Sequence, residues 1–211
     1  MLRFARYKKD VIMLDVVKDE FTIIKNNSAA DEIFNSASEY LGLITKNNLE
    51  NTGSYLICAK KNECSYGGFL EERWFTPQPD VKGLIKLDLL ICIMELKFRI
   101  KEIESQGLIG VVAGLNKTRK KAKKRNVSIK ELTEKYKAYL RIIFPLISKN
   151  SNCLSYSYFL ADKLNQFFIP AVVVIGVRTQ PFYSHAWVEV DGVIINDEPD
   201  LRERLSVILV V

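Results

Sequence analysis

Apolar residues recur every three or four positions after Ser151, which predicts a helix near residues 153–168. The side chains expected on its buried face are Leu154, Tyr158, Ala161, Leu164 and Phe168. Ser151 or Asn152 can cap the start of this helix, and Pro170 is expected to end it. Cys153 is therefore predicted to lie in the first helical turn.

Beyond Pro170 the pattern changes from helical to extended. Residues 171–178 are rich in β-branched side chains, and residues 184–190 alternate between apolar and polar. Asp191-Gly192 follows, and Asp-Gly between valine and isoleucine runs predicts a β-hairpin with residues 193–197. A strict two-residue turn would set Asp197 opposite Ala186, whereas a three-residue turn with Gly192 as a bulge would place it directly across from His185. We therefore expect the bulged turn or an equivalent irregularity in one strand.

The first part of the chain carries a second hairpin signal. Residues 11–17 and 21–25 are apolar runs on either side of Lys18-Asp19-Glu20. Asn27-Ser28 can cap a following helix. The side chains that share one face of that helix are Ile33, Phe34, Ala37, Tyr40 and Leu41.

Two prolines interrupt regular structure at residues 76–80. We therefore predict an α+β protein with a small domain over residues 1–78 and a helix-plus-antiparallel-sheet domain over residues 79–211. Composition alone equally allows residues 1–78 to be a small DNA-binding winged helix.

The composition is that of an ordinary globular protein, with 48% hydrophobic and 27% charged residues. Its best apolar run, LIKLDLLICIMEL, contains a lysine and an aspartate and is too short to span a bilayer. The N-terminal residues do not resemble a signal peptide, so we expect a cytosolic protein with reduced thiols.

The spacing of the four cysteines, Cys58, Cys64, Cys92 and Cys153, fits no zinc module. We expect no metal site. Neither glycine-rich nucleotide motif is present, so no cofactor is expected from a recognisable motif. Cys92 has the surroundings of a buried small hydrophobe, and Cys58 and Cys64 flank a charged stretch.

Three residues together suggest acyl chemistry. A thiolate at Cys153 would be stabilised by the free N–H groups and the dipole of a first helical turn. His185 is the only histidine in the chain, and the predicted hairpin brings Asp197 near it. A nucleophile, a base and an orienting carboxylate form a triad. A cysteine that only packs beneath the turn and a histidine satisfied in the core remain the alternatives.

The region CLSYSYFLADKLNQFFIPAVVVIGVRTQPFYSHAWVEVDGVIINDEPDLRERLSVI resembles the C-terminal domain of the lasso-peptide maturation proteases, the B proteins of microcin-type gene clusters. These proteins belong to the transglutaminase-like branch of the papain-type cysteine enzymes. DVIMLDVVKDEFTII and FLEERWFTPQPD are also similar to the fused, proteobacterial form. The resemblance covers nearly the whole chain and is weakest in residues 42–66 and 107–140.

The resemblance implies that residues 1–78 form a winged-helix-like leader-recognition domain and that residues 79–211 form a transglutaminase-like cysteine peptidase. It assigns the nucleophile to Cys153, the general base to His185 and the orienting carboxylate to Asp197. The implied partners are a precursor peptide, bound through its leader, and an asparagine-synthetase-like cyclase that closes the macrolactam. The resemblance also implies a dependence on ATP.

Other polar residues have several interpretations. Asn152 and Gln180 are chemically able to complete an oxyanion hole with the Cys153 N–H. Asp162 and Arg178 are interpreted as a solvated helix position and a strand-end charge. The run 117–125 has seven basic residues in nine, so the rest of the chain sums to −1 when the net charge is +6. A solvated loop, a polyphosphate site and a contact for an acidic face of the cyclase remain open for it, and no aromatic residues interleave to stack on nucleic-acid bases.

Two other functions remain open. A transglutaminase or amide acyltransferase would use the same triad and pass the acyl group to an amine. A non-enzymatic nucleic-acid-binding protein would leave the order of Cys153, His185 and Asp197 as coincidence.

Overall fold

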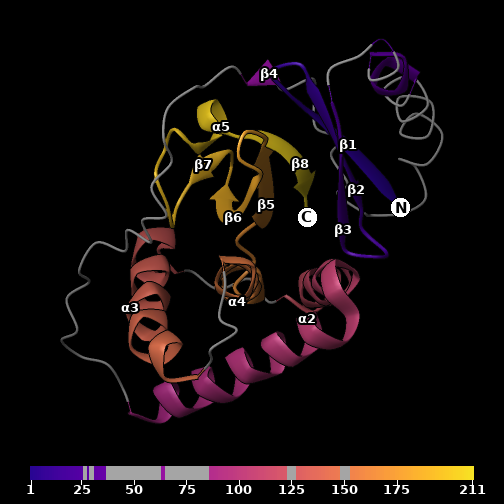
Figure 1. Cartoon of the computed structure of the whole chain (residues 1–211). Helices are drawn as coiled ribbons and strands as arrows, with labels where there is room; N and C mark the ends of the chain where they lie inside the picture. Colours follow the sequence, from indigo (N-terminus) through magenta and orange to yellow (C-terminus); the bar gives the residue numbers. More distant parts are fainter. Residues whose placement is uncertain (26–27, 29–30, 37–62, 65–85, 123–126, 148–152) are drawn as a thin grey trace. The chain divides into compact units, whose positions relative to one another are not determined.

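A computed structural model describes residues 1–25, 28, 31–36, 63–64, 86–122, 127–147 and 153–211 (Figure 1). Contacts divide the chain into two compact units. Unit 1 contains Met1–Leu70, Val174–His185 and Asp200–Val211, and unit 2 contains Glu71–Val173 and Ala186–Pro199.

Unit 1 contains a four-stranded sheet with the order β3-β2-β1-β4. Its strands are β1 (Leu2–Tyr7), β2 (Asp10–Asp15), β3 (Glu20–Ile24) and β4 (Glu63–Cys64). The predicted hairpin is confirmed, because β2 pairs antiparallel with β3 from Asp15↔Glu20 to Val11↔Ile24. β1 was not predicted: it pairs antiparallel with β2, and β4 pairs parallel with β1.

A helix covers part of this sheet, as predicted. Residues 31–36 are helical, and Phe34 packs against Val11 in the core of the sheet. Arg6 lies with its guanidinium 4.6 Å from the Phe34 ring centre and forms an ion pair with Asp31 at 2.7 Å. Ile33 is 40% exposed, so it does not share the burial expected for its face. The residues expected on the rest of that face, Ala37, Tyr40 and Leu41, lie outside the described residues.

β8 (Ser206–Val210) also belongs to unit 1 and was not predicted as a strand. The Ser206 hydroxyl donates a hydrogen bond of 2.5 Å to the carbonyl oxygen of Arg6 in β1. All five residues of β8 are buried. The end of the chain is therefore packed into the unit that contains the N-terminal sheet.

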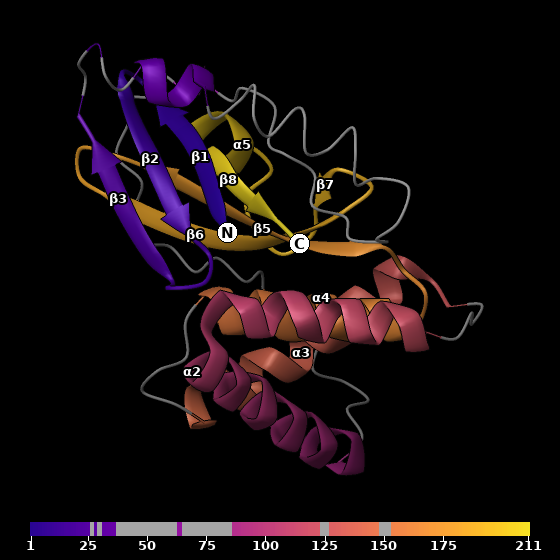
Figure 2. The same ribbon diagram turned by 90° about the vertical axis from the view of Figure 1, so that its right-hand side faces the viewer.

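Unit 2 is built around three helices, α2 (Lys86–Lys121), α3 (Ile129–Ile147) and α4 (Cys153–Gln166). α2 bends at Gly107, whose φ of 58° and ψ of −146° are accessible to glycine and strained for other residues. We call residues 86–106 its first limb and residues 108–121 its second limb. The second limb runs side by side with α4 (Figures 1 and 2).

α4 is buried on all sides. Every residue from Ser155 to Asn165 is buried, including serines, an aspartate, a lysine and an asparagine. Leu164, Ala161 and Tyr158 lie in the core as predicted, whereas Phe168 lies beyond the end of the helix and is 63% exposed. A helix surrounded by protein must satisfy its polar side chains internally, which sets the conditions for the site described below.

The second sheet has the order β7-β6-β5-β8. β5 (Ala171–Arg178) and β6 (Tyr183–Val190) confirm two predicted strands, and β5 pairs antiparallel with β8. β7 (Val193–Ile194) is shorter than the predicted 193–197, and a short helix, α5 (Leu201–Arg204), precedes β8.

The predicted α+β class is confirmed by this combination of helices and largely antiparallel sheets. The winged-helix character of the first part and the division into residues 1–78 and 79–211 stay predictions, and residues 76–80 lie outside the described residues. No helix in the described part of the chain has both the length and the apolar character needed to cross a membrane.

Candidate active site

Cys153 is the first residue of α4, as predicted from the helical pattern. Its thiol is partly buried and is not in a disulfide. The N–H groups of a first helical turn have no partner within the helix, and the helix dipole is positive at this end. These two features are the basis of the expectation that this position favours a thiolate. The predicted capping residues, Ser151 and Asn152, lie outside the described residues.

The second turn of α4 is fixed against β6. The Ser157 hydroxyl donates a hydrogen bond of 3.0 Å to the carbonyl oxygen of Ala186, and both residues are buried. Ala186 directly follows His185 in the sequence. One hydrogen bond thus ties the helix that begins at Cys153 to the strand position next to the histidine, and nothing in the sequence pattern predicted the role of Ser157.

His185 lies in the unit 1 part of β6, where its surroundings are aromatic and cationic. Its ring is stacked with that of Tyr183, with the centroids 6.0 Å apart and the planes at 20°. The guanidinium of Arg178 lies 5.6 Å from the centre of the Tyr183 ring. Arg178 is the last residue of β5, which confirms the predicted strand-end position, but its side chain is buried.

The turn between β6 and β7 differs from the expected one. Val190 pairs with Val193 and Glu189 with Ile194, so the loop has two residues, and the predicted three-residue bulged turn is wrong. Asp191 and Gly192 have φ values of 51° and 81°. Two successive residues with positive φ give a hairpin turn whose twist matches that of the flanking strands, which accounts for the preference.

The ladder ends before Asp197, so the two-residue turn does not decide on which face Asp197 lies. The Ile195 N–H still donates to the Val188 carbonyl oxygen at 3.0 Å. The Val188 N–H, however, donates to Oδ1 of Asn196 at 2.7 Å. A side-chain acceptor replaces the next backbone acceptor, and residues 195–197 form a bend. Asn196 is therefore the residue that terminates β7.

Asp197 acts electrostatically on Tyr156, a residue of α4. Burial raises the pKa of the Tyr156 hydroxyl, and the negative charge of Asp197 raises it further. Tyr156 is three residues after Cys153 in α4. Asp197 also accepts a hydrogen bond of 2.8 Å from the Glu198 N–H.

The structure thus brings two of the three predicted residues, Cys153 and Asp197, into unit 2, while His185 is the last residue of its segment in unit 1. Ser157 bonds to Ala186, the residue after His185, and the charge of Asp197 acts on Tyr156.

The two predicted oxyanion donors have different outcomes. Asn152 lies outside the described residues. Gln180 precedes a cis peptide bond to Pro181, and its side-chain amide donates to Asp10 at 3.3 Å. Its assignment as an oxyanion donor stays a prediction.

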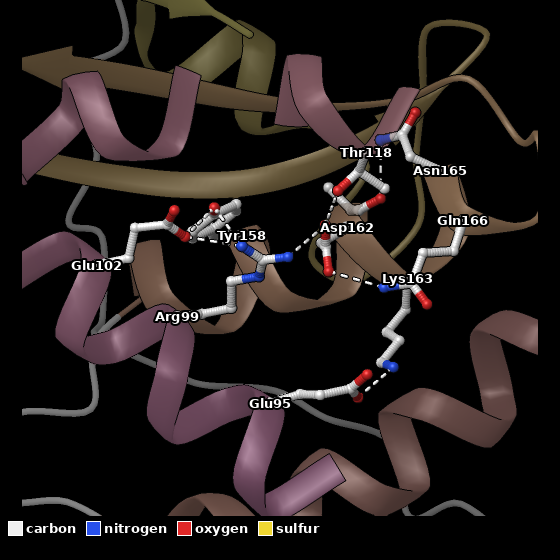
Figure 3. Close-up of polar contacts among 10 residues, drawn as sticks. Glu95, Arg99, Glu102, Thr118, Tyr158, Asp162, Lys163, Asn165 and Gln166 are labelled. Atoms are coloured by element: carbon white, nitrogen blue, oxygen red, sulfur yellow. Dashed lines mark hydrogen bonds and ion pairs between the residues drawn. The ribbon is translucent and has the colours of Figure 1, made fainter. Parts of the chain in front are cut away.

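The prediction of a solvated Asp162 is wrong. Asp162 is 2% exposed and lies on the side of α4 that faces α2, where a charged side chain needs partners (Figure 3). It forms an ion pair of 3.0 Å with Arg99 and accepts hydrogen bonds from Thr118 at 2.5 Å and Gln166 at 3.0 Å. Periodicity marks apolar positions only, so it gave no sign of this burial.

Arg99 extends the same network to Tyr158. It forms an ion pair with Glu102 at 2.8 Å and a hydrogen bond with the Tyr158 hydroxyl at 3.0 Å. The Tyr158 hydroxyl also bonds to Glu102 at 2.5 Å, and Lys163 pairs with Glu95 nearby. We refer to Arg99, Glu102, Thr118, Tyr158 and Asp162 as the α2–α4 network.

The basic run is only partly a loop. Residues 117–121 form the last turn of α2, which contradicts the solvated-loop reading for that part, and residues 123–125 lie outside the described residues. Arg119 points into the structure and donates to the carbonyl oxygen of Ala171 at 2.9 Å and to the Asn165 side chain at 3.3 Å. Lys117 and Lys121 line a hollow of about 420 Å³ in the bend of α2, which we call the elbow pocket.

The elbow pocket does not fit a nucleotide triphosphate. Its lining offers two lysine side chains on a helix face and includes none of the residues at the Gly107 bend, where backbone N–H groups could be free. Phosphate sites commonly use a helix N-terminus or a nest of free backbone N–H groups. We therefore derive no chemical step through ATP. Among the described residues there is also no cluster of three or more side chains that could hold a metal ion.

Comparisons with known proteins agree with the resemblance in sequence. A family model described as the transglutaminase-like superfamily matches residues 98–210. Among curated proteins, the chain is 36% identical over 213 residues to the Microcin J25-processing protein McjB of Escherichia coli, and the match covers 99% of both chains. No solved structure matches the chain. The chain therefore belongs to the transglutaminase-like superfamily and, within it, to the family of lasso-peptide maturation B proteins that includes this microcin-processing relative.

Proposed function

We propose that this protein is a cysteine peptidase that removes the leader from a lasso-peptide precursor. The observation that carries the proposal is the 36% identity, over 99% of both chains, to a protein named for processing microcin J25. The position of Cys153 at the start of α4 supports the chemistry, and so does the effect of the Asp197 charge on Tyr156 in the same helix.

In the proposed mechanism His185 takes the proton from Cys153, and the sulfur attacks the carbonyl carbon that joins leader to core. The C–N bond then breaks, the imidazolium gives its proton to the departing α-amine, and the leader remains attached as a thioester. Water, deprotonated by His185, attacks this thioester, so the leader carboxylate and the free thiol are released. Asp197 holds the imidazole in the required tautomer and stabilises its positive charge. The freed amine of the core peptide would be the substrate of an asparagine-synthetase-like cyclase.

The direct test is mass analysis of a synthetic precursor incubated with the purified full chain. Hydrolysis predicts a free leader acid and a core peptide with a free amine. Cys153→Ala should give neither product, whereas the matched variant Cys92→Ala, at a buried thiol, should remain active once folded. Cleavage by Cys153→Ala would overturn the proposal.

Acyl transfer is the second candidate, because the matching family model is transglutaminase-like. In that reaction an added primary amine would take the acyl group from Cys153. The same mass assay, repeated with a large excess of a simple amine, separates the two reactions. A leader amide instead of a leader acid would establish acyl transfer.

Leader recognition is proposed for the N-terminal sheet. β3 is at the edge of the sheet, and an edge strand has unpaired N–H and C=O groups to which an extended peptide can add. Hydrogen exchange on full-length Cys153→Ala should show slower exchange in residues 20–24 when leader peptide is added. Unchanged exchange there, with leader bound, would place recognition elsewhere. The full chain is used because β8 packs against β1 within unit 1.

A further inference from the structure

The first limb of α2 has a stripe of large exposed apolar side chains. They are Leu87, Leu90, Ile91, Met94 and Phe98, with exposed fractions of 66%, 59%, 46%, 72% and 60%. Spacings of three and four residues place all five on one helix face. The stripe runs for roughly 17 Å at the rise of an α-helix. Contiguous exposed apolar surface of this kind marks interaction sites in soluble proteins.

Two hollows meet at Phe98. One is the elbow pocket, which Phe98 shares with Phe167, Lys117 and Lys121. The other, of about 440 Å³, is lined by Met94, Lys97, Phe98, Ile100, Lys101, Glu104 and Ile147. Because Phe98 lines both, the apolar stripe and the two hollows form one continuous surface, which we call the α2 face.

The charges beside the α2 face are unbalanced. Its neighbouring carboxylates are engaged: Asp88 pairs with Lys135 at 2.9 Å, Glu95 with Lys163, and Glu102 with Arg99. Four lysines line the two hollows and have no ion pair with any residue that the structure describes; they are Lys97, Lys101, Lys117 and Lys121. The three paired acids do not neutralise these lysines, and Glu104, which also lines the second hollow, is one carboxylate against four lysines, so the face keeps a net positive charge around an apolar centre.

We propose that the α2 face is the docking site for an acidic amphipathic helix of a partner protein. The apolar stripe fits the apolar side of such a helix, with anchors at intervals of three and four residues. The four lysines then lie where acidic flanks would meet them, and opposite charges increase the rate and specificity of association. This inference does not depend on the proposed peptidase activity.

A nucleic acid fits the face less well. Affinity for nucleic acid comes mainly from phosphate contacts, and single strands also stack their bases on aromatic rings. Phe98 and Phe167 are the aromatic rings of this surface, and the rest of the stripe consists of leucine, isoleucine and methionine, which offer nothing to a phosphate or a base plane. The apolar stripe would remain uncovered in such a complex.

The test uses a defined probe, a fluorescein-labelled 20-residue designed peptide with leucines on one helix face and glutamates on the others. Fluorescence anisotropy with the full chain should show saturable binding that weakens as salt is added. Two matched peptides are the controls: one with the same composition but shuffled leucines, and one with lysine in place of each glutamate. Both should bind at least ~10-fold more weakly, a loss of about 1.4 kcal/mol of binding free energy.

Variants of the protein locate the binding. Met94→Asp should lower the affinity for the acidic peptide at least ~10-fold, and so should the double variant Lys97→Glu/Lys101→Glu. The matched controls are Val193→Asp, at an apolar residue 64% exposed on β7, and Lys130→Glu, at an exposed lysine on α3. Neither control should change the affinity, and circular dichroism checks that all variants are folded.

Several results would overturn the proposal. These are no binding of the acidic peptide, equal binding of the shuffled peptide, or equal loss in the control variants. A single-stranded oligonucleotide that binds more tightly than the peptide and requires the same lysines would assign the face to nucleic acid. Concentration-dependent dimerisation that Met94→Asp abolishes, without peptide binding, would assign it to a second copy of the chain.

Discussion

The two ends of α4 are both surrounded by protein, yet their polar groups are used differently. At the start, Cys153 is partly buried, Ser157 bonds to the Ala186 carbonyl, and Asp197 lies close to Tyr156. In the second half, Asp162 has three partners within the α2–α4 network. The cysteine of α2 belongs to this second region, because Lys163 and Glu95 influence the ionisation of Cys92.

The difference shows that burial of a charged residue does not identify a reactive site. In the α2–α4 network each ionised group has an opposite charge and hydrogen bonds that fix its state, so no group is available to move a proton. At the start of α4 the groups have complementary chemistry instead: a thiol at a positive helix end and a carboxylate whose charge acts on Tyr156. Substitutions at the two ends should therefore separate activity from stability.

The largest effect is expected for the proposed triad. His185→Ala should lower kcat/KM for leader cleavage by about 10³-fold or more, because no other histidine can replace the base. Asp197→Asn should retain part of the activity if the carboxylate only orients the imidazole and stabilises its charge. Rates from the mass assay, with chemical denaturation of each variant, provide the measurement. Full activity in His185→Ala would contradict the triad.

The next effect concerns the other end of α4. Asp162→Asn should lower the free energy of unfolding by about 3 kcal/mol, at the low end for a broken buried ion pair, because Arg99 loses its more buried carboxylate partner and keeps Glu102. The folded fraction should still cleave leader at a rate within a few-fold of the wild type. Asp88→Asn, which breaks a more exposed ion pair with Lys135, should cost about 1 kcal/mol or less. A stable but inactive Asp162→Asn protein would place the network within the active site.

A smaller effect is expected at Gly114, where the second limb of α2 touches α4. A Cβ atom added there would lie 1.7 Å from the Tyr158 hydroxyl oxygen, so the tyrosine must move away from Glu102 and Arg99. Gly114→Ala should destabilise the protein by about 1–3 kcal/mol, although alanine favours helices. Adding Tyr158→Phe removes the clashing oxygen. The double variant should therefore lose less free energy of unfolding than the sum of the losses in the two single variants. If urea denaturation shows that the two losses of unfolding free energy simply add, the clash between position 114 and the Tyr158 hydroxyl is not the cause of the destabilisation.

The sequence predicted the start of α4, strands β5 and β6 and the Asp-Gly hairpin because each follows from local rules of periodicity, capping or turn chemistry. Three features depended on contacts between distant segments and had no local signal. Asp162 was predicted to be solvated because its partner Arg99 is 63 positions away. β7 was predicted too long because the Asn196 side chain replaces a backbone acceptor. β8 pairs with a strand about 30 residues earlier, and no pattern in its short apolar run indicated this.

The smallest effect tests the contrast between the two cysteines. Burial raises the pKa of Cys92 from 9.0 to about 11. Between these values the unfolded chain releases the proton while the folded protein keeps it, so the stability that Cys92 contributes is complete below pH 9 and is lost as pH rises through 11. From pH 8 to pH 10 the wild type should lose about 1 kcal/mol more stability than Cys92→Ala, a comparison that cancels the other titrating groups. Urea denaturation at several pH values measures this difference. Parallel pH curves for the two proteins would mean that the Cys92 thiol titrates as it does in water, and the distinction between a structural thiol in α2 and a reactive one at the start of α4 would then rest on Cys153 alone.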